Sequence, residues 1–165
     1  MSKTIEFLYG KTLSELKEIC MDNNLPAFNA TQIAQWLYTK HAGSVDDMTN
    51  LSVKTRELLK QKYSLGLLPH SNVQTSADGT KKYLFPTHDG HFIESAYIPD
   101  RERATLCVSS QVGCRMGCQF CMTGKQGFQA NLSVNEILNQ VRSLPEMNTL
   151  SNLVYMGMGE PLDNI

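Results

Sequence analysis

A run of closely spaced cysteines constrains this chain more than any other feature of its sequence. Cys114, Cys118 and Cys121 have the spacing C-x3-C-x2-C. Three thiols cannot all pair with one another as disulfides, because one is always left over. Thiolates are soft ligands that suit iron–sulfur clusters, zinc or Cu(I). A [4Fe-4S] cluster held by three cysteines keeps one iron without a protein ligand, and that iron can bind a small molecule.

Two other interpretations of these thiols are open at this point. They can belong to a zinc site with a distant fourth ligand, or they can be unrelated buried thiols. Zinc sites usually contain paired C-x2-C halves, and only one such half is present. The chain has 5 cysteines, an odd number, which indicates a reducing compartment and metal or redox chemistry rather than a disulfide framework. We therefore favour the cluster.

Charge and hydropathy exclude some classes of partner. The formal net charge is -1, so no global field points to nucleic acid or to a membrane surface. No apolar run approaches the roughly 20 residues that span a bilayer. The first residues lack the features of a signal peptide. We expect a cytoplasmic protein without membrane contact.

Residues 1–65 predict a helical accessory module. Thr12 and Glu15 form a capping-box pattern ahead of an apolar helical face, and Asn29 and Gln32 repeat that pattern ahead of a second one. Further N-cap signals precede a short turn and a last helix, at Ser44 and Ser52.

Residues 66–100 predict a linker followed by a small antiparallel β meander. The period changes from helix to strand, with strands expected at 73–77, 82–85 and 92–98. The turn signals Asp78-Gly79 and Asp89-Gly90 separate these strands.

Residues 101–165 predict the first βαβ unit of a larger parallel fold. A strand at 105–109 feeds the cysteine loop, a helix follows the capping box Ser133-x-x-Glu136, and a strand at 153–156 leads into a glycine loop at 157–161. Both loops therefore lie at the carboxyl ends of parallel strands, where such folds place their active sites. The fold class is α/β, and we expect the last domain to be incomplete in this sequence.

Several residues outside the cysteine triad are candidates for chemistry. Glu160 in the glycine loop can accept a hydrogen bond from a cationic amine, although such loops are often only turns. Glu94 lies on an apolar strand, where partial burial would favour proton transfer, but an exposed strand position is the commoner case. Cys107 is either a thiol placed to react beside the cluster loop or a small buried strand residue. The charges Arg101, Arg103, Arg115 and Lys125 are interpreted as a rim around the loop that contacts RNA phosphate or simply faces solvent.

The cysteine and glycine loops together resemble the radical S-adenosylmethionine superfamily. The matching residues are Cys114-x3-Cys118-x-Phe120-Cys121 and the downstream Gly159-Glu160-Pro161. This resemblance implies a partial TIM-like barrel in which the three cysteines hold a [4Fe-4S] cluster. It also implies that the open iron binds the amino and carboxyl groups of S-adenosylmethionine, with Gly159 and Glu160 near the methionine amine.

Longer stretches are similar to the RlmN/Cfr family of radical adenine methyltransferases. The resemblance covers essentially the whole chain, and it reaches about the first half of a typical member. The stretches are Arg103-Ala-Thr-Leu-Cys107-Val-Ser-Ser-Gln-Val-Gly-Cys114, Thr123-Gly-Lys-Gln-Gly-Phe128, Asn131-Leu132, Met156-Gly-Met-Gly-Glu-Pro-Leu162, Leu8-Tyr9-Gly10-Lys11 and Gln32-Ile33-Ala34-Gln35-Trp36-Leu37-Tyr38.

This second resemblance implies roles for two residues. Glu94 stands where the family has its proton acceptor, and Cys107 stands where it has a cysteine that forms a transient disulfide. The partner in that disulfide is a C-terminal, methyl-carrying cysteine. It would lie beyond Ile165, so we expect the 165-residue chain alone to be inactive.

The implied reaction of the whole protein is methylation of carbon 2 of an adenine. The implied substrates are 23S rRNA and tRNA next to the anticodon, and the implied electron donor is an external protein such as a flavodoxin or ferredoxin. Two alternatives stay open: methylation of carbon 8 by a member of the same family, and a non-catalytic iron–sulfur or RNA-binding module.

Overall fold

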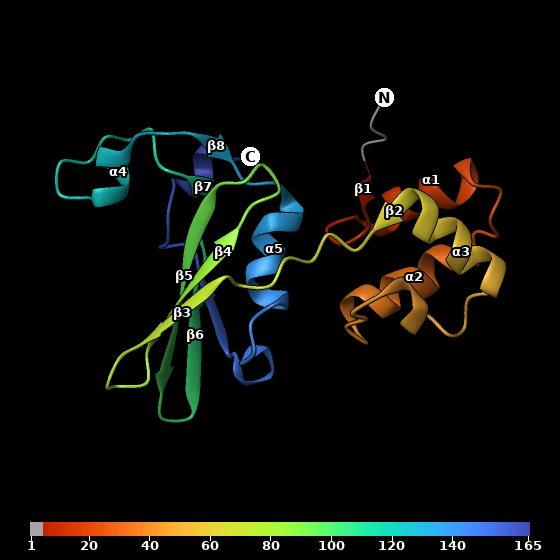
Figure 1. The fold of residues 1–165 in the computed structure, drawn as a ribbon, viewed down its shortest axis with the longest axis horizontal. Helices are drawn as coiled ribbons and strands as arrows, with labels where there is room; N and C mark the ends of the chain where they lie inside the picture. Colours follow the sequence, from red (N-terminus) through yellow and green to blue (C-terminus); the bar gives the residue numbers. More distant parts are fainter. Residues whose placement is uncertain (1–4) are drawn as a thin grey trace. The chain divides into compact units, whose positions relative to one another are not determined.

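A helical unit comes first in the computed structural model, which describes residues 5–165 (Figure 1). This unit extends to Leu67, and a second unit comprises Leu68–Ile165. The elements of the first unit are β1 (Glu6–Phe7), α1 (Leu13–Asp22), α2 (Phe28–Tyr38), the 3-10 turn η1 (Val45–Asp47), α3 (Val53–Lys62) and β2 (Tyr63–Ser64). Strands β1 and β2 pair in parallel, a feature that the sequence did not reveal.

Side-chain caps begin most of these helices where the sequence predicts them. Thr12 accepts a hydrogen bond from the Glu15 backbone and Glu15 reaches back to Thr12, which confirms the capping box of α1. Ser52 caps α3 through the Thr55 N–H group. The expected cap at Asn29 is wrong, because α2 already begins at Phe28 and Asn29 is buried within it.

The second unit is built around one five-stranded sheet (Figure 1). The strand order is β3-β4-β5-β6-β9; neighbours are antiparallel except for the parallel pair β6–β9. The sheet elements are β3 (Asn72–Thr75), β4 (Lys81–Pro86), β5 (Phe92–Asp100), β6 (Arg103–Cys107) and β9 (Asn152–Val154). The predicted meander and the predicted parallel pair are therefore both present, and they share one sheet.

The remaining elements connect β6 to β9 and follow β9. They are β7 (Gln111–Val112), α4 (Met122–Gln126), β8 (Ala130–Asn131), α5 (Val134–Arg142), η2 (Met147–Thr149) and η3 (Pro161–Asp163). Strands β7 and β8 form a small antiparallel pair of their own, which is a second feature the sequence did not reveal. Among residues 5–165 the large sheet does not close on itself, and no helix has the length and hydropathy to cross a bilayer.

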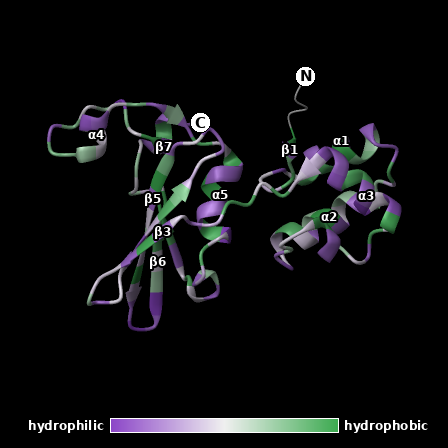
Figure 2. Ribbon diagram, viewed as in Figure 1, coloured by the Kyte–Doolittle hydropathy of each residue, from purple (hydrophilic) through white to green (hydrophobic). Residues whose placement is uncertain are grey.

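One face of the large sheet packs against α5 and forms the core of the second unit. Phe85, Ile93 and Leu106 point to this face and are almost fully buried, with Ile137 and Val141 of α5 packed against them. Because side chains alternate along a strand, the residues between them point to the other face. In Figure 2 the apolar residues lie along the strands, and the turn between β5 and β6 is hydrophilic.

A buried amide joins α5 to this core. Gln140 is fully buried, and its Oε1 accepts hydrogen bonds from the Ser95 hydroxyl at 2.6 Å and the Ser109 N–H group at 2.8 Å. Its Nε2 donates to the Ser109 carbonyl oxygen at 2.9 Å. Both polar ends of the amide are satisfied, as a polar group in an apolar core requires.

Replacement of this amide by a similar apolar side chain tests its contribution to the fold. Gln140→Leu leaves the Ser109 N–H and C=O groups and the Ser95 hydroxyl buried without partners, so we expect a loss of about 3 kcal/mol in the free energy of unfolding. Urea unfolding followed by circular dichroism measures this loss. The same substitution at Gln35, exposed on α2, should cost less than about 0.5 kcal/mol. Equal losses in the two variants would contradict the prediction.

Candidate functional site

The cysteine loop connects β7 to the short helix α4. Within it, Cys118 is exposed, Cys114 and Cys121 are half-buried, and all three thiols are free. Gly117 has a φ of +62°, which an L side chain rarely adopts, and the Cys121 N–H group donates to the Cys118 carbonyl oxygen at 3.1 Å. The loop thus turns back on itself between its second and third cysteines.

The donor chemistry of this loop fits an iron–sulfur cluster. Three soft, unpaired thiols lie on one accessible loop, as cluster ligation requires. In the part of the chain that the structure describes, no group of three or more His, Cys, Asp or Glu side chains stands in a metal-holding arrangement. The three thiols therefore do not converge in this conformation of the loop, and their role as ligands stays a prediction.

Two thiols of the site have pKa values shifted in opposite directions. The Gly124 N–H group, with help from the Thr123 N–H group and hydroxyl, lowers the pKa of Cys121 because these donors stabilise the thiolate. Burial raises the pKa of Cys107, and a hydrogen bond from the Met156 N–H group opposes this only in part. Cys121 is thus the better thiolate of the two.

Cys107 and Glu94 point to the same face of the large sheet. Cys107 is the last residue of β6 and pairs with Ala96 on β5, two positions after Glu94. Both face away from α5, because their neighbours Leu106 and Ile93 belong to the core on the α5 side. The register of the strands therefore brings the predicted proton acceptor and the predicted disulfide-forming thiol to one surface.

Glu94 is exposed rather than buried. Its carboxylate is 48% exposed and lies 3.0 Å from the Lys82 ammonium group on β4. Of the two positions that the sequence left open, the structure therefore shows the exposed one, which is the commoner case for a strand carboxylate. Its role as proton acceptor stays a prediction.

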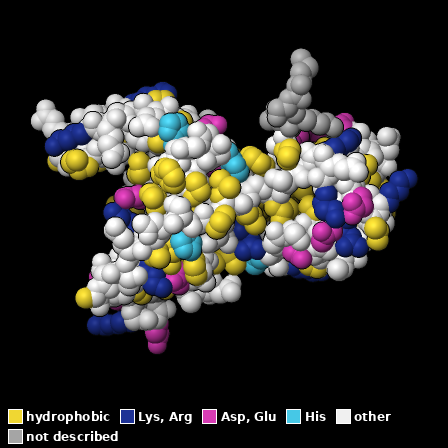
Figure 3. Space-filling model, in the orientation of Figure 1, with side chains coloured by type: hydrophobic (Ala, Val, Ile, Leu, Met, Phe, Trp, Pro, Cys, Tyr) yellow, Lys and Arg dark blue, Asp and Glu magenta, His cyan; other side chains and the backbone are white. Residues whose placement is uncertain are grey.

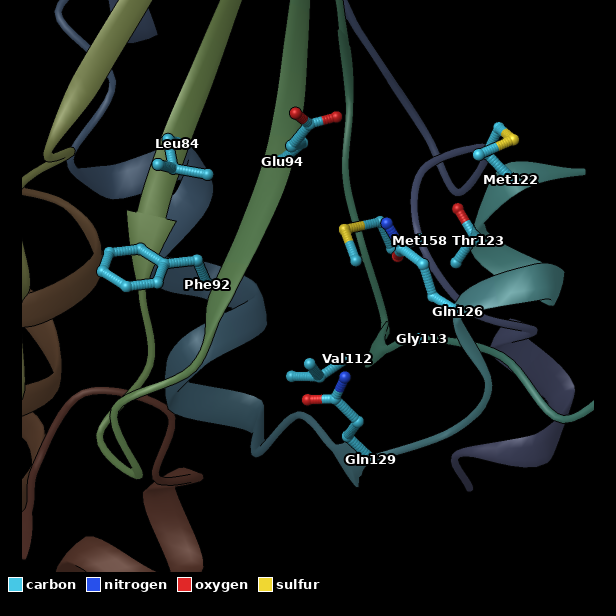
Figure 4. A pocket seen from close by; sticks show the side chains of 10 residues that line it. All are labelled: Leu84, Phe92, Glu94, Val112, Gly113, Met122, Thr123, Gln126, Gln129 and Met158. Carbon is cyan, nitrogen blue, oxygen red and sulfur yellow. The ribbon is translucent and has the colours of Figure 1, made fainter.

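Glu94 also lines a cavity of about 520 Å³ (Figure 4). Leu84 and Glu94 of the sheet lie on one side of it, and Met122, Thr123 and Gln126 of α4 lie on the other. The full lining is Leu84, Phe92, Glu94, Val112, Gly113, Met122, Thr123, Gln126, Gln129 and Met158. The cavity therefore lies between the sheet face and the helix that follows the cysteine loop.

The glycine loop packs tightly against the segment from Val108 to Gln111. A Cβ atom on Gly159 would lie 2.6 Å from the Gln111 Cβ, and one on Gly157 would lie 2.7 Å from the Ser109 hydroxyl oxygen. Between them, the Met158 carbonyl oxygen accepts from two backbone N–H groups of this segment, at 2.8 and 3.2 Å. The chain's own packing therefore explains both glycines, and the contact of Gly159 with a cofactor stays a prediction.

Glu160 is anchored at both its backbone and its side chain. Its N–H group donates to the Gln111 Oε1 at 3.0 Å. Its carboxylate accepts from the Leu162 N–H group at 3.1 Å and so caps the turn η3. The carboxylate of Glu160 is thus held near the carboxyl end of β9, on the loop that packs against the residues leading to the cysteines.

The basic residues do not form the predicted rim. Arg101 and Arg103 lie at the turn between β5 and β6, at the opposite end of the sheet from α4 (Figure 1). The sequence-based interpretation placed them beside the cysteine loop. That placement is wrong, because the length of β6 separates them from the loop. Lys125 lies in α4, and Arg115 stacks over the Phe128 ring at 3.8 Å and lies 3.8 Å from the Asp163 carboxylate.

Comparison with known families identifies two regions of the chain. Residues 7–65 match the model of the ribosomal RNA large subunit methyltransferase N-terminal domain. Residues 108–165 match the model of the radical SAM superfamily, where SAM is S-adenosylmethionine. The two matches correspond to the helical unit and to the part of the second unit that carries the cysteine and glycine loops.

Individual proteins match nearly the whole chain. A protein of Bacteroides fragilis named probable dual-specificity RNA methyltransferase RlmN is 60% identical over 96% of this chain and 46% of its own length. The dual-specificity RNA methyltransferase RlmN of Geotalea uraniireducens is 47% identical over 93% of this chain and 45% of its own. This chain thus spans about half the length of the curated relatives it matches.

A solved structure shares the fold. The crystal structure of a radical SAM methyltransferase from Sphaerobacter thermophilus superimposes with a TM-score of 0.86 at 39% sequence identity. The match covers 96% of this chain and 48% of that one. The expected α/β architecture of a helical unit followed by the start of a radical SAM domain is therefore confirmed.

The opposite pKa shifts predict the order in which the thiols react. Iodoacetamide alkylates thiolates, so in the metal-free, reduced protein Cys121 should react at lower pH than Cys107. Peptide mapping by mass spectrometry across pH 6–10 measures both profiles. Thr123→Val removes one donor to Cys121 and should move only the Cys121 profile to higher pH. Coincident profiles for Cys107 and Cys121 would contradict the assignment.

Packing of the glycine loop predicts a large cost for a small side chain. Gly159→Ala combines an unfavourable φ of +96° with a clash against Gln111, so we expect a loss of about 3 kcal/mol in the free energy of unfolding. Gly90 has a similar φ of +82° and open space around it. Gly90→Ala should therefore cost only about 1 kcal/mol, by the same urea measurement. Equal losses of unfolding free energy in the two variants would show that the clash with Gln111 does not contribute to the cost of Gly159→Ala.

Proposed function

We propose, from the premise that this chain belongs to the RlmN family of radical SAM proteins, that the protein containing it methylates carbon 2 of adenine in RNA. The proposed substrates are 23S rRNA and tRNA next to the anticodon. The observation that carries the proposal is the 60% identity, over 96% of the chain, to a protein named as a dual-specificity RNA methyltransferase. The free thiols of the cysteine loop add chemical support from this chain itself.

Cys114, Cys118 and Cys121 are the proposed ligands of a [4Fe-4S] cluster. Such a cluster, held by three cysteines, supplies an open iron for S-adenosylmethionine and an electron for its cleavage. The Gly124 and Thr123 donors favour the ionised form of Cys121, which is the form that binds metal. Glu160 is the proposed acceptor for the methionine amine, and Gly159 lets the loop that carries it pack against Gln111.

Glu94 and Cys107 are the proposed reactive groups on the open face of the sheet. Glu94 accepts a proton from the adenine, and its exposed position leaves the carboxylate accessible from the open face of the sheet. The raised pKa of Cys107 keeps its thiol protonated until it is needed for a transient disulfide with a cysteine outside this sequence.

The cavity beside Glu94 is the proposed site of the target base. Its volume of about 520 Å³ and its mixture of apolar, amide and carboxylate groups suit an unstacked base with part of its backbone. The charges on the helical unit are balanced, and Figure 3 shows Lys and Arg interspersed with Asp and Glu on the face in view. We therefore attribute RNA recognition to shape and local contacts rather than to a large basic surface. The proposed setting is the cytoplasm, with a flavodoxin or ferredoxin as electron donor.

The full-length protein provides the test of this function. After anaerobic reconstitution with iron and sulfide, it should methylate 23S rRNA fragments and tRNA when S-adenosylmethionine and a reductant are supplied. Mass spectrometry of the digested RNA should identify 2-methyladenosine. The product 8-methyladenosine would contradict the proposed position of methylation, and no methylated adenosine would contradict the function.

Cysteine variants test the cluster assignment in the same experiment. Cys118→Ser removes one of the three proposed ligands, so iron uptake should fall sharply and methylation should drop to background. Cys20→Ala alters a buried thiol of α1 in the helical unit and should keep wild-type iron content. Wild-type iron content in Cys118→Ser would refute the ligand assignment.

A further inference from the structure

A single buried amide lies between the two loops of the site. Gln111 belongs to β7, three residues before the first cysteine of the loop, and its side chain is fully buried. Buried amides are uncommon, and they require partners for every polar atom. The contacts of Gln111 therefore show what this amide holds in place.

All the hydrogen-bonding groups of the Gln111 amide are used. Its Oε1 accepts from the Glu160 N–H group at 3.0 Å. Its Nε2 donates to the Asp163 Oδ2 and to the Asn131 Oδ1, both at 2.9 Å. A side-chain amide has two N–H donors, so both are engaged. One side chain thus holds Glu160, which precedes the turn η3, and Asp163, the last residue of that turn, and anchors both to β8.

The same network reaches the cysteine loop. Asp163, which accepts from Gln111, also lies 3.8 Å from the Arg115 guanidinium group. Arg115 follows Cys114 directly and stacks on the Phe128 ring at 3.8 Å. The side chains of Gln111 and Asp163 therefore connect the glycine loop to Arg115 of the cysteine loop. Of these two side chains, Gln111 is the fully buried one.

Packing strengthens this connection. Gln111 is the residue against which Gly159 packs, since a Cβ atom on Gly159 would lie within 2.9 Å of three Gln111 atoms. Dense packing and a fully satisfied polar network restrict both partners to one arrangement. Gln111 therefore helps to fix the position of Glu160 relative to the cysteines, together with the backbone contacts of the glycine loop.

We infer that Gln111 is a positioning residue that fixes the glycine loop against the cysteine loop and thereby sets the affinity for S-adenosylmethionine. The inference rests on the function proposed above, because it assigns Gln111 a task toward that cofactor. Gln111 acts through Glu160 and Asp163, and it does so by orientation. Its loss should therefore weaken cofactor binding while the three thiols still take up iron.

Gln111→Glu tests the inference with little change in shape. The carboxylate still accepts from the Glu160 N–H group, but it faces the Asp163 carboxylate with no donor between them, so the turn η3 is pushed away. In the reconstituted full-length protein we expect wild-type iron content and an S-adenosylmethionine dissociation constant about tenfold higher. Equilibrium dialysis measures the constant, and electron paramagnetic resonance of the reduced cluster should need more S-adenosylmethionine for its spectrum to change.

A second substitution should restore a hydrogen bond between positions 111 and 163. Asp163→Asn supplies an amide donor to the new carboxylate, so Gln111→Glu with Asp163→Asn should recover most of the affinity. Asp163→Asn alone keeps an acceptor for Gln111 Nε2 but loses the ion pair with Arg115, so it should weaken binding less than Gln111→Glu does and completes the double-mutant cycle. Gln74→Glu makes the same chemical change on the exposed strand β3 and should match the wild type in every measurement.

Each outcome decides the role of Gln111. Unchanged affinity in Gln111→Glu, or a double variant no tighter than the single one, would overturn the inference. A fall in iron content that matches the fall in binding would overturn it as well, because Gln111 would then only support the fold of the cysteine loop. A wild-type protein that takes up no iron would instead refute the proposed function itself.

Discussion

The close approach of two backbone segments is the constraint on which the rest of the site depends. The segment from Val108 to Gln111 leaves the end of β6, and the glycine loop leaves the end of the parallel strand β9. The two lie so close that a Cβ atom at Gly157 or Gly159 would overlap with atoms of Ser109 or Gln111. The ends of adjacent parallel strands place these segments side by side, and the two glycines permit the final approach. The cysteine loop follows the first segment, so its starting point is fixed by the same contact.

Polar groups inside this contact determine its orientation. The Ser109 hydroxyl donates to the Glu94 carbonyl oxygen at 2.6 Å and accepts from the Met158 N–H group at 2.8 Å. Gln140 of α5 holds the backbone of Ser109 in turn. The backbone of β5, the glycine loop and the helix α5 are thus coupled at one serine. Because a buried polar group without its partner is costly, this arrangement has few alternatives of similar energy.

Short patterns in the sequence predicted the helices and strands. The sequence did not reveal the contacts between residues far apart in the chain. The capping boxes at Thr12 and Ser133 involve residues three apart, so a short motif is sufficient to find them. The start of α2 was missed because the Pro26 carbonyl oxygen, rather than a side chain, accepts from the Asn29 N–H group. Gln111 and Asp163 are 52 residues apart, and no short pattern links them. Gln111 follows two serines and Asp163 precedes an asparagine, so nothing in the local sequence marks either side chain as part of a buried contact.

Cys121 and Cys107 have opposite pKa shifts because they lie at the ends of different elements. Cys121 precedes α4, where the first N–H groups of the helix lack backbone partners and stabilise a thiolate. Cys107 ends a strand flanked on both sides by other strands, and that burial raises its pKa. As the pH rises, Cys121 ionises first, while Cys107 stays protonated until the pH approaches its own, higher pKa. The backbone around each thiol thus separates the two pKa values, and this separation suits the proposed division between Cys121 as a metal ligand and Cys107 as a thiol that stays free.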